Sequence, residues 1–198
     1  MQSIYLTGAG AQPRWSAGSA RTPFLWQSVP VRIREAEPQD AEAIASIHVR
    51  SWQAAYRGLL TDDYLDSLSV SDRLEMHRQM LASPGERRSW VAEESGRVLG
   101  FAVTGPSQDA DADERTGELY AIYLDPERFG RGIGKRLLDH SIGDLRGRGF
   151  RTATLWVLEA NEGARGFYER EGWRADGLTT TERVDCEMRP TVRYRLDL

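Results

Sequence analysis

The stretch FGRGIGKR combines bare backbone with positive charge. Three glycines at every second position stand among three basic residues: Gly130, Gly132 and Gly134, with Arg131, Lys135 and Arg136. Glycine has no Cβ and adopts backbone angles that other residues avoid, so such a segment lets an anion approach main-chain N–H groups closely. The residue types and their spacing therefore predict a loop that binds phosphate.

The segments on either side of this loop predict a strand and a helix. Residues 117–126, GELYAIYLDP, are rich in aromatic and branched side chains and end at a proline. After the loop, apolar residues recur on one side of a helix: Ile133, Leu137, Leu138, Ile142 and Leu145. A helix that begins at such a loop points its first N–H groups, and the positive end of its dipole, at a bound anion.

Two common nucleotide motifs do not match the loop. A P-loop needs G-x-x-x-x-G-K-[ST], but Phe129 stands at the first glycine position and Arg136 at the hydroxyl position. A dinucleotide fingerprint needs G-x-G-x-x-G, whereas this loop reads G-x-G-x-G and the next strand has no acidic residue placed for a ribose. The phosphate must belong to another kind of ligand.

Two motifs together resemble the GNAT superfamily of acyl-CoA-dependent N-acyltransferases, over residues 31–198. The pyrophosphate loop of that family, [QR]-x-x-G-x-[GA], matches 129–134, although Phe129 replaces the usual Gln or Arg. Its second motif, N-x-x-A-x-x-F-Y-x-x-x-G-[FW], matches NEGARGFYEREGW at 161–173. The resemblance implies an α/β (α+β) fold: a mixed, mostly antiparallel sheet, flanked by helices, whose parallel strands at 119–124 and 152–158 splay apart.

The same resemblance implies acetyl-CoA as the acyl donor. The positions expected to contact it are Ile122, Tyr123, Leu124, Phe129, Gly130, Arg131, Gly132, Ile133, Gly134, Lys135, Asn161 and Tyr168. Asn161 is in addition the expected N-cap of its helix. Glu118 precedes Gly132 by fourteen residues, the spacing of the family's catalytic glutamate, and is the expected general base. Tyr168 is expected to protonate the leaving thiolate, and main-chain N–H groups at 122–124 to polarise the thioester carbonyl.

The implied reaction is direct attack of a primary amine on acetyl-CoA in a ternary complex. A non-catalytic acyl-CoA-binding module and an N-acyltransferase for a larger acyl group are the alternatives. The acceptor is an amine of a small molecule, or of a protein or peptide. His48, Trp52 and Tyr56 recur at every fourth position of the first predicted helix. Trp52 and Tyr56 are candidates for binding the acceptor, with core packing as the alternative.

Composition excludes several classes of protein. The chain has 198 residues, a formal net charge of -4, three histidines and one cysteine, Cys186. This charge argues against general nucleic-acid binding, and the Cys and His spacing holds neither a disulfide framework nor a metal site. No apolar run approaches the ~20 residues of a membrane span. We therefore expect a cytoplasmic enzyme without metal, membrane or nucleic-acid partners, and the sequence leaves a homodimer open.

Residues 1–30 differ from the rest of the chain. They are rich in Gly, Ala, Ser and Pro, which predicts an N-terminal extension, docked or flexible, ahead of an acetyltransferase domain at 31–198. Within that domain we expect a first helix that ends at Gly58 and a hairpin that turns at Ser95-Gly96. The acidic run from Asp109 to Glu114 is predicted to be a solvated loop, and His77 has no assigned role.

Overall fold

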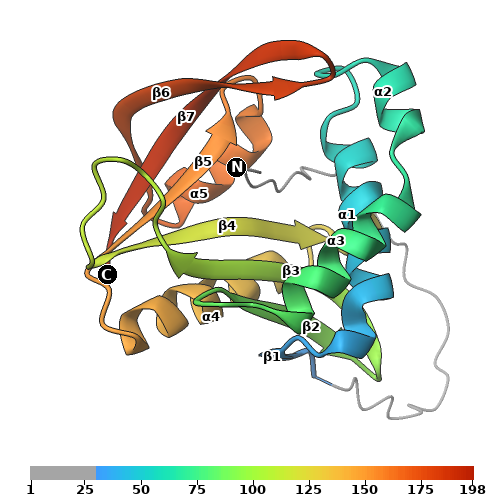
Figure 1. The fold of residues 1–198 in the computed structure, drawn as a ribbon, viewed down its shortest axis with the longest axis horizontal. Helices are drawn as coiled ribbons and strands as arrows, with labels where there is room; N and C mark the ends of the chain where they lie inside the picture. Colours follow the sequence, from blue (N-terminus) through green and yellow to red (C-terminus); the bar gives the residue numbers. More distant parts are fainter. Residues whose placement is uncertain (1–29) are drawn as a thin grey trace, which may run out of the picture.

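A mixed seven-stranded sheet is the centre of the computed structural model, which describes residues 30–198 (Figure 1). The strands lie in the order β1-β2-β3-β4-β5-β7-β6. Their bounds are β1 (Arg32–Glu35), β2 (Arg88–Glu94), β3 (Arg97–Pro106), β4 (Thr116–Leu124), β5 (Thr152–Leu158), β6 (Arg174–Val184) and β7 (Glu187–Asp197). All neighbouring strands are antiparallel except β4 and β5. The expected N-terminal extension lies outside the described residues, apart from Pro30.

Helices cover both faces of the half of the sheet formed by β2, β3 and β4. The helices are α1 (Ala41–Ala55), α2 (Asp62–Ser67), α3 (Val70–Ala82), α4 (Ile133–Gly147) and α5 (Glu162–Arg170). Figure 1 shows α4 behind these strands and α1 and α3 in front of them, toward the carboxyl end of β4. The apolar side predicted for the helix after the glycine loop is buried in α4, from Ile133 to Leu145. The predicted hairpin turn is also present, at Ser95 and Gly96.

The parallel pair β4 and β5 splays apart. Pairing between these strands covers only three positions and ends where Glu118 faces Thr154. Beyond that point β4 continues to Leu124 and β5 to Leu158 with no register between them. The expected fold, a mostly antiparallel mixed sheet that opens between two parallel strands, is therefore confirmed.

Strand β4 contains a bulge just after Glu118. The register between β3 and β4 slips between Val103, which faces Ala121, and Thr104, which faces Leu119, so Tyr120 is the extra residue. A bulge redirects side chains and bends its strand. Here it lets the consecutive residues Tyr120 and Ala121 line the same cavity, described below.

Two further observations concern the described residues only. No helix within 30–198 has both the length and the apolar composition that crossing a membrane would require. Over the same residues, His, Cys, Asp and Glu side chains form no cluster of three or more with the geometry of a metal site.

Candidate active site

The glycine loop leaves main chain uncovered at the start of α4. Gly132 is the N-cap residue of α4, with a φ of 75° and no side-chain cap, and Gly130 has a φ of 74°. A Cβ built on either glycine would meet no atom within 4 Å. The space beside the loop is therefore open, and the first N–H groups of α4 face it, as an anion site requires. A pyrophosphate fits this cradle.

The side chains next to the glycine loop differ in how available they are to a bound phosphate. The Lys135 ammonium pairs with Glu171 at 2.7 Å and with Asp139 at 2.9 Å, so the protein itself holds this side chain. Arg131 is exposed, and Phe129 packs against the core. Main-chain N–H groups and Arg131 are thus the groups most available to a phosphate.

The second motif lies at the start of α5, which follows β5 directly. Because β4 and β5 are parallel, their carboxyl ends lie at the same edge of the sheet, and the glycine loop and Asn161 both follow these ends. Asn161 is the N-cap of α5: its Oδ1 accepts the N–H of Ala164 at 3.1 Å. Its Nδ2 is buried without a hydrogen-bond partner among residues 30–198, which leaves a donor for a bound amide or carbonyl. Tyr168, fully buried on α5, packs near Trp173.

Glu118 lies at the last paired position of β4, where the sheet begins to open. The side chain is 4% exposed, and its Oε2 accepts the main-chain N–H of Gln108 at 3.2 Å and the hydroxyl of Ser107 at 3.4 Å. Burial raises the pKa of the Glu118 carboxyl from 4.5 to about 7; the hydrogen bond from Gln108 opposes this rise, and the charge of Asp109 adds to it. A carboxyl with such a pKa exchanges protons readily at neutral pH.

A cavity of about 320 Å³ lies between α1, α3 and the strands β3 and β4. Aromatic, thioether and imidazole side chains dominate its wall, among them His48, Met76, Phe101, Tyr120 and Tyr123, and Gln108 also lines it. A second, more open hollow of about 580 Å³ shares Met76, Gln108 and Tyr120 with it. Gln108 lines both spaces and bonds Glu118, so the carboxyl lies directly behind this wall. The volume suits a small ligand with an apolar body.

Two histidines form the wall of this cavity on the side of α1 and α3. His48 Nδ1 lies 3.1 Å from His77 Nε2, and the His48 ring stacks on Tyr123 with centroids 4.8 Å apart. Burial lowers the pKa of His48 well below its usual value, and burial likewise lowers the pKa of His77 to about 4. Both rings are therefore neutral near pH 7. No local pattern predicts a partner for His77, because its contact, His48, lies 29 residues away along the chain.

The structure buries Trp52 and Tyr56, and neither lines the cavity. Trp52 is 5% exposed, and its indole N–H donates to the hydroxyl of Tyr123 at 3.0 Å. Tyr56 packs against Trp52 with ring centroids 4.9 Å apart. Trp52 therefore reaches the cavity through Tyr123, while Tyr56 belongs to the core.

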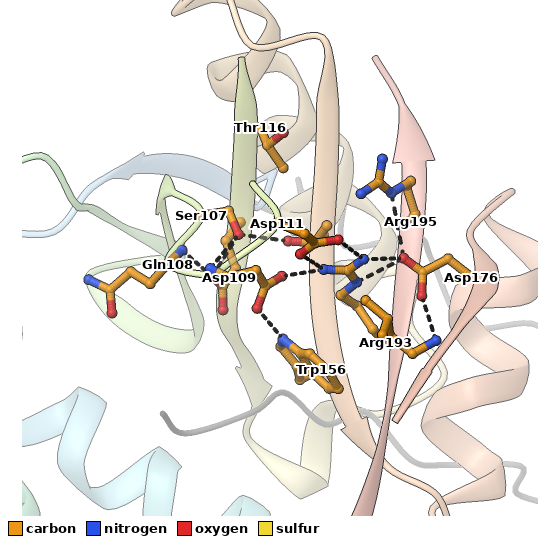
Figure 2. A network of polar contacts seen from close by, with 12 residues as sticks. Ser107, Gln108, Asp109, Asp111, Thr116, Trp156, Asp176, Arg193 and Arg195 are labelled. Atoms are coloured by element: carbon orange, nitrogen blue, oxygen red, sulfur yellow. Dashed lines mark hydrogen bonds and ion pairs between the residues drawn. The ribbon is translucent and has the colours of Figure 1, made fainter. Parts of the chain in front are cut away.

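Sequence reasoning missed the contacts of the loop between β3 and β4. We expected a solvated acidic run, but the side chain of Asp109 is 6% exposed and accepts hydrogen bonds from Trp156 at 2.9 Å and Arg193 at 3.0 Å (Figure 2). Arg193 is itself 3% exposed. The sequence around Arg193 alternates charged and apolar residues and gives no sign that this arginine is buried, and the partners lie 84 residues apart.

An anion loop after one splayed strand, an unpaired amide donor after the other and a proton-accepting carboxyl at their junction define an acyltransferase that uses an acyl-CoA. The chain belongs to the acetyltransferase (GNAT) family, whose model matches residues 42–173. The family's acyl donor, acetyl-CoA, is the cosubstrate of this enzyme.

Named relatives agree with this membership. An uncharacterized N-acetyltransferase of Bacillus subtilis is 37% identical over 132 residues, which cover 66% of this chain and 73% of the relative. A probable N-acetyltransferase of Mycobacterium tuberculosis is 34% identical over 170 residues, 84% of this chain and 93% of the relative. The crystal structure of the PaiA N-acetyltransferase from Thermoplasma acidophilum in complex with coenzyme A has the same fold, with a TM-score of 0.65 at 21% identity, and covers 85% of this chain and 99% of its own.

Proposed function

We propose that this enzyme transfers the acetyl group of acetyl-CoA to the primary amine of a small molecule by direct attack in a ternary complex. The observation that carries the proposal is Glu118, a buried carboxyl with a pKa of about 7 between an open cavity and the point where β4 and β5 part. A small molecule is favoured over a protein because the aromatic cavity is about 320 Å³.

Glu118 acts as the general base in this proposal. A protonated amine has no lone pair for attack, so its proton must leave before the carbon–nitrogen bond forms. The carboxylate takes that proton, directly or through one water, at the wall formed by Ser107 and Gln108. General-base assistance of this kind typically contributes about 10² to 10⁴ in rate.

Main chain and Tyr168 act on the thioester. As the amine attacks the carbonyl carbon, main-chain N–H groups of β4 between Ile122 and Leu124 that point away from β3, beyond the last position paired with β5, stabilise the developing oxyanion. The carbon–sulfur bond then breaks, and Tyr168 supplies a proton to the departing thiolate. Cys186 lies exposed at the turn between β6 and β7, outside both motifs, so the proposal includes no covalent enzyme intermediate.

Binding of the pyrophosphate and the amide-bearing arm of acetyl-CoA holds the thioester at the other end of the molecule in place. Gly130 and Gly132 let the phosphates reach the N–H groups at the start of α4, including that of Gly134, and Arg131 adds charge. Asn161 Nδ2 donates to the amide-bearing arm from the start of α5. This binding energy orients the reacting carbon, which lowers the entropic part of the barrier.

The acceptor cavity selects an amine with an apolar or aromatic body. Phe101, Tyr123 and Met76 supply the apolar wall, and Trp52 fixes the Tyr123 hydroxyl by its hydrogen bond. The neutral His48 adds no charge to the cavity, so the acceptor needs no anionic group to pair with this ring.

Acyl transfer to a panel of amines, followed by release of free CoA thiol, tests the proposal. Glu118→Gln should lower kcat/KM by about 10² or more at pH 7, with acetyl-CoA affinity unchanged and a smaller loss at higher pH. Glu114→Gln, an exposed residue of the neighbouring loop, is the matched control and should behave as wild type. Acetyl-CoA binding without transfer to any amine would instead favour a binding module. Faster turnover with succinyl-CoA or propionyl-CoA would favour a larger acyl group.

A further inference from the structure

A buried arginine joins the loop that contacts Glu118 to the far half of the sheet. Arg193 lies on β7 opposite Trp156 of β5, and all three guanidinium nitrogens are engaged by carboxylates (Figure 2). Nη1 donates to Asp109 at 3.0 Å, the two Nη atoms bind Asp111 at 2.6 and 2.8 Å, and Nε donates to Asp176 at 2.8 Å. Arg193 thereby holds segments of the chain from both sides of the sheet opening.

The geometry runs from Arg193 to Glu118 in two steps. Asp109 is held by Arg193 and by the indole of Trp156, and its own N–H donates to Ser107 Oγ at 3.3 Å. Ser107 and the next residue, Gln108, supply the two hydrogen bonds to Glu118 Oε2. We propose that Arg193, through its ion pair with Asp109, positions the catalytic carboxyl. Arg193 fixes the loop that hydrogen-bonds Glu118 and balances the negative charge of Asp109.

The Arg193–Asp109 ion pair is almost completely buried. The side chains of Arg193 and Asp109 are 3% and 6% exposed, so loss of Arg193 leaves the charge of Asp109 uncompensated. Asp111, by contrast, is half exposed, and its pKa is lowered to about 2 by the hydrogen bonds from Arg193. Asp109 is thus the member of the cluster whose charge acts on Glu118 through the protein interior.

The groups that face Glu118 predict in which direction the ion pair shifts the pKa of this carboxyl. From the loop, Ser107 and Gln108 donate hydrogen bonds and Asp109 contributes a negative charge. Arg87 contributes a positive charge, and Tyr120 is a neutral phenol of the same strand. The Thr154 hydroxyl of β5 bonds Ser107 at 3.3 Å. Without Arg193, the negative charge of Asp109 is no longer balanced and the loop no longer holds its hydrogen bonds to Glu118. Each change disfavours the Glu118 carboxylate.

The role of the ion pair rests on the proposed function, but its test does not. The Glu118 carboxyl is followed by carbon-13 NMR in the full chain labelled at glutamate side-chain carboxyls, and the signal missing in Glu118→Gln identifies it. Arg193→Met should raise the titration midpoint of Glu118 by about 0.5 pH unit or more. Asp109→Asn should lower it by a similar amount, because the negative charge is lost while Arg193 still holds the loop through Asp111 and the amide oxygen still accepts from Trp156. Arg193→Lys keeps the positive charge but loses the bidentate guanidinium, so it should raise the Glu118 midpoint by less.

Matched variants separate this role from simple stabilisation. Arg195→Met removes an arginine of β7 that contacts Asp176 but not Asp109, and Glu114→Gln removes an exposed charge of the same loop. Neither should move the midpoint. An unchanged Glu118 midpoint in folded Arg193→Met would overturn the proposal; where that variant does not fold, an Asp109→Asn midpoint equal to that of Glu114→Gln would overturn it.

Activity then tests the proposed function separately. The acid limb of the pH profile of kcat/KM should move with the NMR midpoint in both variants. A midpoint that moves without the kinetic limb supports the positioning of Glu118 and refutes its role as the base.

Discussion

Replacing Glu118 with glutamine should stabilise the fold while it removes activity. The fold buries this carboxyl and raises its pKa from 4.5 to about 7, so ionising it is harder in the folded chain than in the unfolded chain. Each pKa unit corresponds to about 1.4 kcal/mol, which gives a destabilisation of about 3 kcal/mol once the group is charged. Glutamine has the same shape, carries no charge and keeps an oxygen that accepts from Gln108.

The sign of the effect gives it a pH window. Below the unfolded pKa both states carry the proton, and the wild type and Glu118→Gln should have equal stability. As pH rises through 4.5 the unfolded chain ionises first, and the wild type loses stability until the folded group ionises near pH 7. Above pH 7 the difference should stay constant at about 3 kcal/mol in favour of Glu118→Gln.

Urea unfolding at several pH values between 4 and 8 measures this difference. Glu114→Gln is the control, because its carboxyl is exposed and its replacement should change the free energy of unfolding equally at all these pH values. A Glu118→Gln protein that is no more stable than wild type at pH 8 would refute the raised pKa, and with it the physical basis for Glu118 as a base near neutrality.

Three further substitutions test other parts of the site. Gly132→Val should weaken acetyl-CoA binding by about tenfold or more in calorimetry, because a side chain at a φ of 75° strains the loop and occupies the open cradle. Tyr168→Phe should lower turnover with acetyl-CoA, and stopped-flow measurements with thioesters of more acidic thiols should show the deficit fading; a deficit independent of the leaving thiol would exclude the protonation role. Ala121→Leu should narrow the cavity and raise the acceptor KM by about tenfold without changing acetyl-CoA affinity, and equal changes in both would place Ala121 outside the acceptor wall.

Local patterns of sequence predicted the elements that position the cofactor. The glycine loop and the helix after it could be read directly, because alternate glycines and a period of 3.6 residues are local signals. The N-cap role of Asn161 was also predicted and is confirmed by its bond to Ala164. The opening between β4 and β5 followed from the family resemblance, since no local pattern encodes where two parallel strands part.

Contacts between distant residues explain what the sequence could not predict. The acidic run from 109 to 114 has the composition of a solvated loop, and Asp111, Asp113 and Glu114 are exposed; the covering of the Asp109 side chain depends on Arg193 and Trp156, each from a different strand. The bulge at Tyr120 arises from the register with β3 and leaves no local sign. The pairing of His48 with His77 requires α1 and α3 to pack together, which periodicity alone does not specify.

The short seam between β4 and β5 has a consequence for how the two halves of the sheet are held together. On one side of the seam β1 to β4 form one half of the sheet, and on the other side β5, β7 and β6 form the second half, so each half is a continuous stretch of the chain. Within residues 30–198, strand pairing joins the two halves at only three positions, Thr116 with Thr152, Gly117 with Ala153 and Glu118 with Thr154. A cofactor that touches both halves stabilises this joint by mass action, by about 2.7 kcal/mol at a hundredfold excess over its Kd. The acetyl-CoA concentration around the enzyme therefore sets how firmly its two halves are held together.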